Sequence, residues 1–209
     1  LNGIDAREYP PIDLSLNDDF ISLSVKDFKN IVNQTNYASS TDESRIVLTG
    51  LNLKTNKDML ECSATDSYRL SLNKYKMEKS LTKDVNIIIP SRNLTELLKL
   101  FFDESEEMLN IYIFGNKIIF KFNNIIFQSR LINGSYPNTV NLIPNETLFD
   151  LRINKREFYN MVDRASILNN DRDNNIITLE INNNLLKITS MSLEIGKVEE
   201  KLAINCSDN

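Results

Sequence analysis

Apolar and polar residues follow a recurring order along this chain, in which a short strand pattern leads into an amphipathic helix pattern. Residues 20–35, FISLSVKDFKNIVNQT, are the clearest example. Ser24 ends the strand pattern and Asp27 follows three residues later, which is the spacing of a helix-capping box. The apolar residues that come next recur at helical spacing and are Phe28, Ile31, Val32 and Thr35. This stretch predicts a strand, a cap and a helix with one buried face.

The same order recurs twice farther along the chain. Residues 149–165, FDLRINKREFYNMVDRA, predict a strand, a cap at Asn154 with Glu157 three residues on, and a helix. Its apolar stripe consists of Phe158, Met161, Val162 and Ala165. Residues 85–102, VNIIIPSRNLTELLKLFF, again predict a strand, a cap and a helix, with a stripe of Leu94, Leu97, Leu98, Phe101 and Phe102. The offsets from the first helix are about 130 and about 66 residues, so the chain contains an internal repeat.

Strand patterns follow each predicted helix. The matching strands of the first and last copies are IVLTGLNL at 46–53 with IITLEIN at 176–182, and LECSAT at 60–65 with LKITSM at 186–191. The strands LNIYIF, KIIFKF and IIFQSRLI are joined by Gly115-Asn116 and Asn123-Asn124, residue types typical of tight hairpin turns. Each half-unit is therefore β-α-β-β-β. Two half-units of roughly 65 residues predict an α+β domain with two helices packed on antiparallel sheet.

The end of the repeat also recurs at the start of the chain. GIDAREYPPID, with Tyr9-Pro10, matches LINGSYPNTVNLIP, with Tyr136-Pro137, at an offset of 127 residues. We therefore expect residues 1–14 to be the tail of a preceding domain plus a linker, and residues 15–144 to be one complete domain. Residues 145–209 are expected to be the first half of a third, truncated domain.

The composition of the chain narrows the range of functions that it could have. The chain has 209 residues, 41% of them hydrophobic and 25% charged, which is typical of a folded globular protein. No apolar run approaches the roughly 20 residues that span a bilayer, so no membrane association is expected. Two cysteines in a chain of this length favour a reducing, cytoplasmic location over a disulfide framework. The absence of histidine removes Ser-His-Asp and Cys-His catalysis and the commonest zinc ligand, and no glycine-rich phosphate motif occurs. We expect no cofactor and no enzymatic activity.

Carboxylates remain the one candidate metal site, because Mg²⁺ and Ca²⁺ prefer oxygen ligands. The acidic pairs and clusters are Asp42 with Glu43, Glu104 with Glu106 and Glu107, and Asp171 with Asp173. None has the glycine and spacing of an EF-hand loop, so solvated turns are the preferred interpretation. A carboxylate-metal phosphoesterase that uses Asp42, Glu43 and Asp66 stays open as an alternative function. A repeat-built structural scaffold without DNA is the other.

Six strings in this sequence resemble those of the bacterial DNA polymerase III beta subunit family, the sliding clamps. They are YPPID, YASSTDESRIVLTGL, ATDSYRLSL, IIIPSRNLTELLKL, LINGSYPNTVNLIP and REFYNMVDRASIL, in that order. The resemblance implies a DNA-clamp fold with three domains per chain, and a homodimeric ring around duplex DNA when the chain is complete. It also implies a non-catalytic processivity factor of DNA replication. The implied partners are duplex DNA, bound without sequence preference, the polymerase III alpha subunit, the clamp loader and repair factors.

The resemblance further implies a cleft between the second and third domains that takes short, extended hydrophobic peptides. The matching positions here are Leu48, Thr65, Ser67, Tyr68, Arg69, Leu70, Pro137, Asn141 and Leu142. Apolar members would form the floor, while Thr65 and Arg69 would fix the register of the peptide. Without the family, Leu48 and Leu70 would be read as core residues and Arg69 as a structural partner of Asp66. Tyr68 stands where family members often have His, and Asn141 where some have Arg, so the preferred peptide stays open.

The predicted helices have basic residues opposite their apolar stripes, and the resemblance implies that these faces line the pore. The candidate DNA-facing residues on these helices are Lys26, Lys29, Arg92, Lys99, Arg156 and Arg164, and Arg45 in the loop 42–47 is a further candidate. Any amphipathic helix has a solvated face with some Lys and Arg, and the acidic residues Asp27, Glu96 and Asp163 dilute the signal. The net charge of −5 argues against tight phosphate binding. A clamp that holds DNA by topology needs only a mildly positive inner surface.

Overall fold

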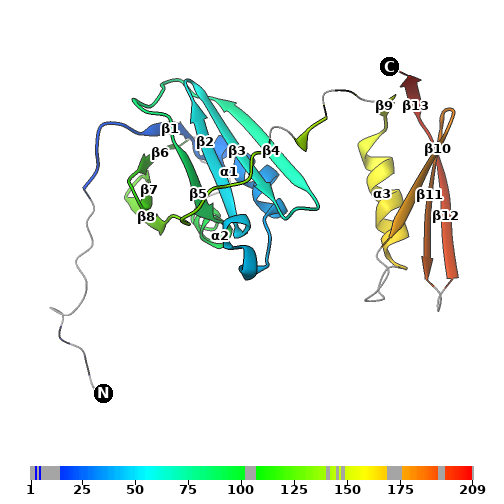
Figure 1. The fold of residues 1–209 in the computed structure, drawn as a ribbon, viewed down its shortest axis with the longest axis horizontal. Helices are drawn as coiled ribbons and strands as arrows, with labels where there is room; N and C mark the ends of the chain where they lie inside the picture. Colours follow the sequence, from blue (N-terminus) through cyan, green and yellow to red (C-terminus); the bar gives the residue numbers. More distant parts are fainter. Residues whose placement is uncertain are drawn as a thin grey trace. The chain divides into compact units, whose positions relative to one another are not determined.

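We describe a computed structural model of the chain (Figure 1). It describes residues 3, 5, 15–101, 107–139, 142–144, 146, 149–168, 176–192 and 196–208. The chain divides into two compact units, residues 1–142 and 143–209. In the part of the chain that is described, no helix is long and apolar enough to cross a bilayer.

Unit 1 contains two β-α-β-β-β half-units, as the sequence predicts. The first consists of β1 (Ile21–Ser24), α1 (Val25–Thr35), the short 3-10 segments η2 (Asn36–Ala38) and η3 (Glu43–Thr49), β2 (Gly50–Asn56), β3 (Met59–Thr65) and β4 (Leu70–Lys76). The second consists of β5 (Asn86–Pro90), α2 (Ser91–Leu98), β6 (Met108–Ile113), β7 (Lys117–Phe122) and β8 (Ile125–Arg130). Their equal element order confirms the repeat.

The two half-units exchange their first strands. One sheet has the order β4-β3-β2-β5 and the other β1-β6-β7-β8, with all neighbours antiparallel. Strand β5 of the second half-unit thus pairs with β2 of the first, where Ile89 lies opposite Leu51. Strand β1 of the first pairs with β6 of the second, where Ile21 lies opposite Ile111. Neither half-unit completes a sheet without the other.

Both sheets and both helices of unit 1 enclose one hydrophobic core. Helix α1 contacts β3 and β4 of one sheet and β1 and β6 of the other, while α2 contacts β2 and β5. Phe28 of α1 lies at the centre, with ring centroids 5.5 Å from Phe120 and 6.1 Å from Phe101. The predicted α1 stripe of Phe28, Ile31, Val32 and Thr35 is fully buried, which confirms the helix face.

The helices begin where the capping pattern predicts, with one exception. The Ser24 side chain accepts a hydrogen bond from the Asp27 amide at 3.0 Å, and the Asn154 side chain accepts from the amides of Arg156 and Glu157. Each bond satisfies an amide that the first helical turn leaves without a partner. In α2 the residue before the helix is Pro90, and no side chain caps the helix.

Unit 2 contains one half-unit of the same kind. Its elements are β9 (Phe149–Arg152), α3 (Lys155–Ser166), β10 (Ile177–Asn182), β11 (Leu185–Ser192), β12 (Gly196–Ala203) and β13 (Asn205–Asp208). Strands β10, β11 and β12 form an antiparallel sheet, and β9 pairs with β13. Helix α3 packs on the three-stranded sheet through a small core of Met161, Ala165, Leu186, Ile188 and Ile204.

The structural repeat corrects one predicted strand match. Asn154 follows its equivalent Ser24 by 130 residues, but the hairpin residue Asn183 follows its equivalent Lys57 by only 126. Unit 1 therefore has four more residues between its helix and its first hairpin. Residues 46–49, which the sequence predicts to be part of a strand, belong to η3, and β2 begins at Gly50. The apolar run IVLT resembles a strand but forms the 3-10 segment that this longer connection contains.

One helix-to-strand contact recurs at equivalent positions with different chemistry. In unit 1, Asn73 of β4 donates from its side-chain amide to the side-chain carbonyl oxygen of Gln34 on α1, at 2.6 Å. In unit 2 the equivalent residues are Glu200 of β12 and Arg164 of α3, which form two hydrogen bonds of 2.6 and 2.7 Å. Both pairs fasten the last turn of the helix to the same strand of its half-unit.

Candidate functional site

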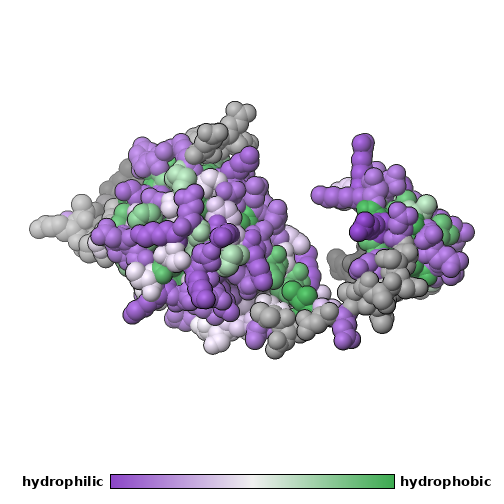
Figure 2. Space-filling view, turned by 90° about the horizontal axis from the view of Figure 1, so that it is seen from above, coloured by the Kyte–Doolittle hydropathy of each residue, from purple (hydrophilic) through white to green (hydrophobic). Residues whose placement is uncertain are grey.

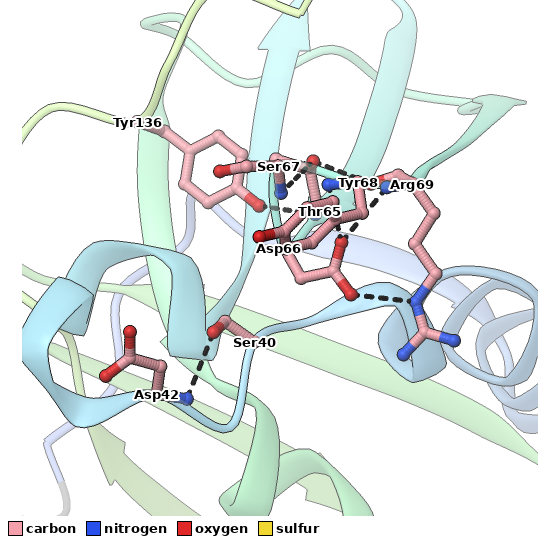
Figure 3. Close-up of polar contacts among 8 residues, drawn as sticks. All are labelled: Ser40, Asp42, Thr65, Asp66, Ser67, Tyr68, Arg69 and Tyr136. Carbon is pink, nitrogen blue, oxygen red and sulfur yellow. Dashed lines mark hydrogen bonds and ion pairs between the residues drawn. The ribbon is translucent and has the colours of Figure 1, made fainter. Parts of the chain in front are cut away.

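The turn between β3 and β4, residues 66–69, contains four of the residues that the sequence assigns to the partner site or places beside it. We call it the Tyr68 turn. Thr65 and Leu70 pair across its base. The Asp66 carboxylate accepts hydrogen bonds from the amides of Tyr68 at 2.9 Å and Arg69 at 3.0 Å (Figure 3). These two amides, together with the Arg69 charge, hold the pKa of the Asp66 carboxyl below its usual range.

Two residues at the tip of the turn are unusual. Ser67 has a φ of +81°, a left-handed backbone conformation that residues other than glycine rarely adopt. Tyr68 follows it, and its side chain is 95% exposed. A large aromatic side chain that is this exposed contributes almost no buried surface to the hydrophobic core. Exposed aromatic residues of this kind are frequent at binding surfaces.

Thr65 fixes the base of the turn from the buried side. Its hydroxyl donates to the Arg69 carbonyl oxygen at 2.6 Å and accepts from the Ser67 amide at 3.1 Å. Its own amide donates to the hydroxyl of Tyr136 at 2.9 Å (Figure 3). Burial raises the pKa of Tyr136, so this phenol stays neutral at physiological pH. Tyr136 thereby brings the exposed Pro137, its neighbour in sequence, to the same end of the unit.

The connection between α1 and β2, residues 36–49, lies against the same turn. The amide of Ser40 donates to the carbonyl oxygen of Leu48, which closes the connection on itself. The Ser40 hydroxyl accepts from the Asp42 amide at 3.0 Å (Figure 3). Arg45 reaches across and donates from Nη1 to the Ser67 hydroxyl at 2.8 Å. Unit 1 has four more residues than unit 2 between its helix and its first hairpin. These four residues therefore belong to the segment that contacts the Tyr68 turn.

Arg69 has structural partners on both sides. Its Nε lies 3.0 Å from an Asp66 carboxylate oxygen, and its guanidinium lies 5.7 Å from the centre of the Tyr37 ring. The Asp66 pairing is the structural alternative that the sequence leaves open. Arg69 remains more than half exposed, so part of its guanidinium is accessible to a ligand.

The remaining residues assigned to the cleft differ in accessibility. Leu48 is only 5% exposed and therefore belongs to the core in this conformation, whereas Leu70 is half-buried on β4. Leu142 is 62% exposed. Asn141 lies outside the described residues. The sequence did not single out Tyr37 and Ile46, which are large, exposed side chains on the 36–49 connection. Their only sequence signal is an apolar residue within a polar loop.

The candidate DNA-facing residues divide by their contacts. Lys99 pairs with Glu96 at 2.8 Å, Arg164 pairs with Glu200, and Arg45 contacts Ser67 and Asp42. Lys29 is half-buried. For Lys26, Arg92 and Arg156, no ion pair exists among the described residues, and all three are exposed on their helices. By position, these three are the best placed of the candidates to contact an external anion.

The structure offers no support for the carboxylate-metal alternative. In the described ranges, no three acidic or cysteine side chains gather around a point that could hold a metal ion. The Asp42 carboxylate accepts from the Ser44 amide, and Asp66 accepts from its own turn. Glu104, Glu106 and the pair Asp171 and Asp173 lie outside the residues described, whereas Glu107 is described and half-buried. Hydrophilic side chains cover most of the visible face of unit 1, with apolar side chains in small patches (Figure 2).

The architecture defines the class of protein: an α+β clamp fold built from β-α-β-β-β half-units. It superposes on the crystal structure of the DNA polymerase sliding clamp of Bacillus subtilis with a TM-score of 0.93 and 37% identity, over 100% of this chain and 55% of that one. For the DNA polymerase III beta chain of Streptococcus pneumoniae the TM-score is 0.91 and the identity 34%, over 100% of this chain and 55% of that one.

Sequence comparison identifies the family. Residues 22–138 match the DNA polymerase III beta subunit, central domain, and residues 140–209 match the DNA polymerase III beta subunit, C-terminal domain. The chain belongs to the DNA polymerase III beta subunit family. The beta sliding clamp of Staphylococcus epidermidis is 43% identical over 205 residues, which are 98% of this chain and 54% of that protein. The chain thus spans about half the length of the curated relatives that it matches.

Proposed function

We propose that this protein is a sliding clamp, a non-catalytic processivity factor that encircles duplex DNA and tethers the replicative polymerase to it. The observation that carries the proposal is the match of both units to the beta subunit family, over residues 22–138 and 140–209. The relatives that it resembles are named beta sliding clamps. Ring closure by a second copy belongs to the proposal for the protein in its natural length.

The charge of the chain suits a protein that slides. Tight phosphate binding would need many basic contacts, each of which adds a salt-dependent increment to affinity. This chain has a net charge of −5, and several of its candidate DNA-facing cations are already paired within the protein. Weak contacts from Lys26, Arg92 and Arg156, combined with encirclement, allow long residence without a fixed position on the duplex.

The partner site is the Tyr68 turn with its neighbours. It offers an exposed aromatic ring at Tyr68, apolar surface at Leu70 and Pro137, and a partly accessible guanidinium at Arg69. Short hydrophobic peptides bind such surfaces through a few anchor side chains, while polar groups fix their register. A weak peptide contact becomes long-lived when the clamp is linked topologically to the same DNA, because the second contact is then intramolecular.

Peptide binding tests the partner site directly. A labelled Gln-Leu-x-Leu-Phe peptide, with serine at x, is titrated against the protein and against an Arg69→Ala, Leu70→Ala double variant, with fluorescence anisotropy as the readout. We expect binding in the micromolar range that the double variant weakens at least about tenfold, a loss of about 1.4 kcal/mol. Arg130→Ala, an exposed arginine on β8, is the matched control and should bind as the parent does. A folded parent that does not bind contradicts the docking role.

Retention on DNA tests the encirclement. The protein in its natural length is loaded onto a nicked circular duplex by a clamp loader, and the fraction bound is measured before and after the circle is cut once. Loss of the protein on linearisation, at a salt concentration that leaves the circle occupied, is the expected result. Equal retention on both forms would indicate ordinary binding. No retention on either, with peptide binding intact, would favour a scaffold that does not act on DNA.

A further inference from the structure

Arg45 connects the two chain segments that form the candidate partner site. Its Nη1 donates to the Ser67 hydroxyl at 2.8 Å, across the gap between the 36–49 connection and the Tyr68 turn. Its Nε lies 3.6 Å from an Asp42 carboxylate oxygen. Asp42 is itself held by the Ser40 hydroxyl and accepts from the Ser44 amide at 2.9 Å. The guanidinium is therefore oriented by its own segment before it reaches the turn.

Ser67 is the residue of the turn that most needs support. Its φ of +81° brings Cβ close to the backbone, a conformation that glycine adopts freely and serine does not. Such conformations persist where surrounding contacts hold them, and they recur at binding sites. For Ser67 these contacts are the Thr65 hydroxyl, which accepts from the Ser67 amide, and Arg45, which donates to the Ser67 hydroxyl. One support comes from the strand and the other from Arg45.

We infer that Arg45 is a positioning residue of the partner site, which holds Ser67 in its left-handed conformation so that Tyr68 is presented to the bound peptide. This inference rests on the proposed docking function and assigns Arg45 to it in place of a DNA contact. The effect of Arg45 on a partner passes through Ser67. Removing Arg45 should loosen the Tyr68 turn without removing any group that touches the peptide.

Amide hydrogen exchange measures the turn independently of any ligand. The amides of Tyr68 and Arg69 both donate to Asp66, so their exchange reports whether the turn is closed. The variants are Arg45→Ala, Ser67→Gly and the two combined, with Arg130→Ala as the control for loss of an exposed arginine. We expect Arg45→Ala to speed exchange at both amides about three- to tenfold, the range of one net hydrogen bond. In the Ser67→Gly background the same change should have no effect, because glycine needs no support and offers no hydroxyl.

The parent, these four variants and Arg45→Lys are then titrated with the Gln-Leu-Ser-Leu-Phe peptide. Arg45→Ala should weaken binding about fivefold in the parent and leave it unchanged in the Ser67→Gly background, and Arg45→Lys should restore part of the loss. Unchanged exchange in Arg45→Ala overturns the inference. A loss of affinity that persists with Ser67→Gly also overturns it, since Arg45 would then contact the peptide itself. If Arg45→Ala exchanges faster than the parent but the parent binds no peptide, the docking function on which the inference rests is refuted. The contact of Arg45 with the Tyr68 turn then still stands.

Discussion

At the scale of single residues, local pairing decides which side chains are available. Arg156 and Arg164 lie on one helix, and the sequence assigns both to the DNA-facing surface, yet Arg164 has a carboxylate partner in Glu200. The Arg164 guanidinium holds the pKa of Glu200 below its usual range, so this pair stays charged well into acid. Arg156, two turns earlier on the same helix, has no such partner in the described chain. Of the two, Arg156 is the better candidate for contact with phosphate.

Cys62 provides a prediction at this scale. Burial raises the pKa of its thiol from 9.0 to about 12. In a Cys206→Ala background, the folded protein should therefore not react with a thiol reagent such as DTNB at pH 8, because the thiolate is the nucleophile. Full reaction should follow on adding denaturant, which is the internal control. Rapid labelling of the folded chain would show that the strand β3 opens locally.

The same thiol has a consequence for stability. Between pH 9 and 12 the unfolded thiol loses its proton and the folded one keeps it, so the folded state binds one more proton and stability falls as pH rises. The slope is about 1.4 kcal/mol for each pH unit. Urea titrations of the parent and of Cys62→Ala should show their difference in stability shrinking over this range. A constant difference would contradict the shift.

At the scale of elements, the sequence predicts those features that depend on residues close together in the chain. The strand-cap-helix order, the buried stripe of α1 and the two-residue turn at Asn123-Asn124 depend on neighbours a few residues apart, and all three are present. The strand proposed over residues 46–53 is wrong in its first half, because an apolar run alone does not distinguish a strand from a 3-10 segment. Nor does any local pattern indicate that Arg45 meets Ser67, since these residues come from different segments.

The helix caps give a prediction at this scale. Replacing Ser24 or Asn154 by Ala removes a side chain that accepts from the first turn, and each change should destabilise its unit by about 1 kcal/mol. Ser91→Ala is the matched control, because α2 has no side-chain cap and Ser91 is its first residue. Urea denaturation followed by circular dichroism measures the shifts. Equal losses for all three variants would mean that the caps contribute nothing specific.

At the scale of the whole molecule, a comparison of equivalent positions in the repeat shows how much a complete sheet buries its strand residues. Leu53 of β2 is 1% exposed beneath the sheet that β5 completes, whereas its equivalent Leu179 of β10 is 51% exposed. In the described part of the chain, β10 has a neighbour on one side only. An unpaired strand edge of this kind accepts further strands readily, from the same chain or from another. The sequence predicts both leucines as strand residues but not this difference, which depends on a strand from the following half-unit.

Substitution of the two equivalent leucines should reflect that difference. Leu53→Ala leaves a cavity in a closed core and should cost about 3 kcal/mol in unit 1. Leu179→Ala removes a side chain that is already half in water and should cost less than about 1 kcal/mol in unit 2. Hydrogen exchange resolved by segment separates the stabilities of the two units. Similar losses at both sites would show that Leu179 is covered in solution, most simply by another copy of the chain.

The exchange of first strands within unit 1 has a consequence for how the protein is made. Strand β1 leaves the ribosome before its partner β6, which is translated about ninety residues later, since Ile21 pairs with Ile111. Until then strand β1 lacks its partner strand, and Phe28 of α1 lacks its ring contacts with Phe101 and Phe120. Contacts between residues so distant in sequence slow folding and leave intermediates open to aggregation. Unit 1 therefore cannot complete either of its two sheets until its second half has been translated.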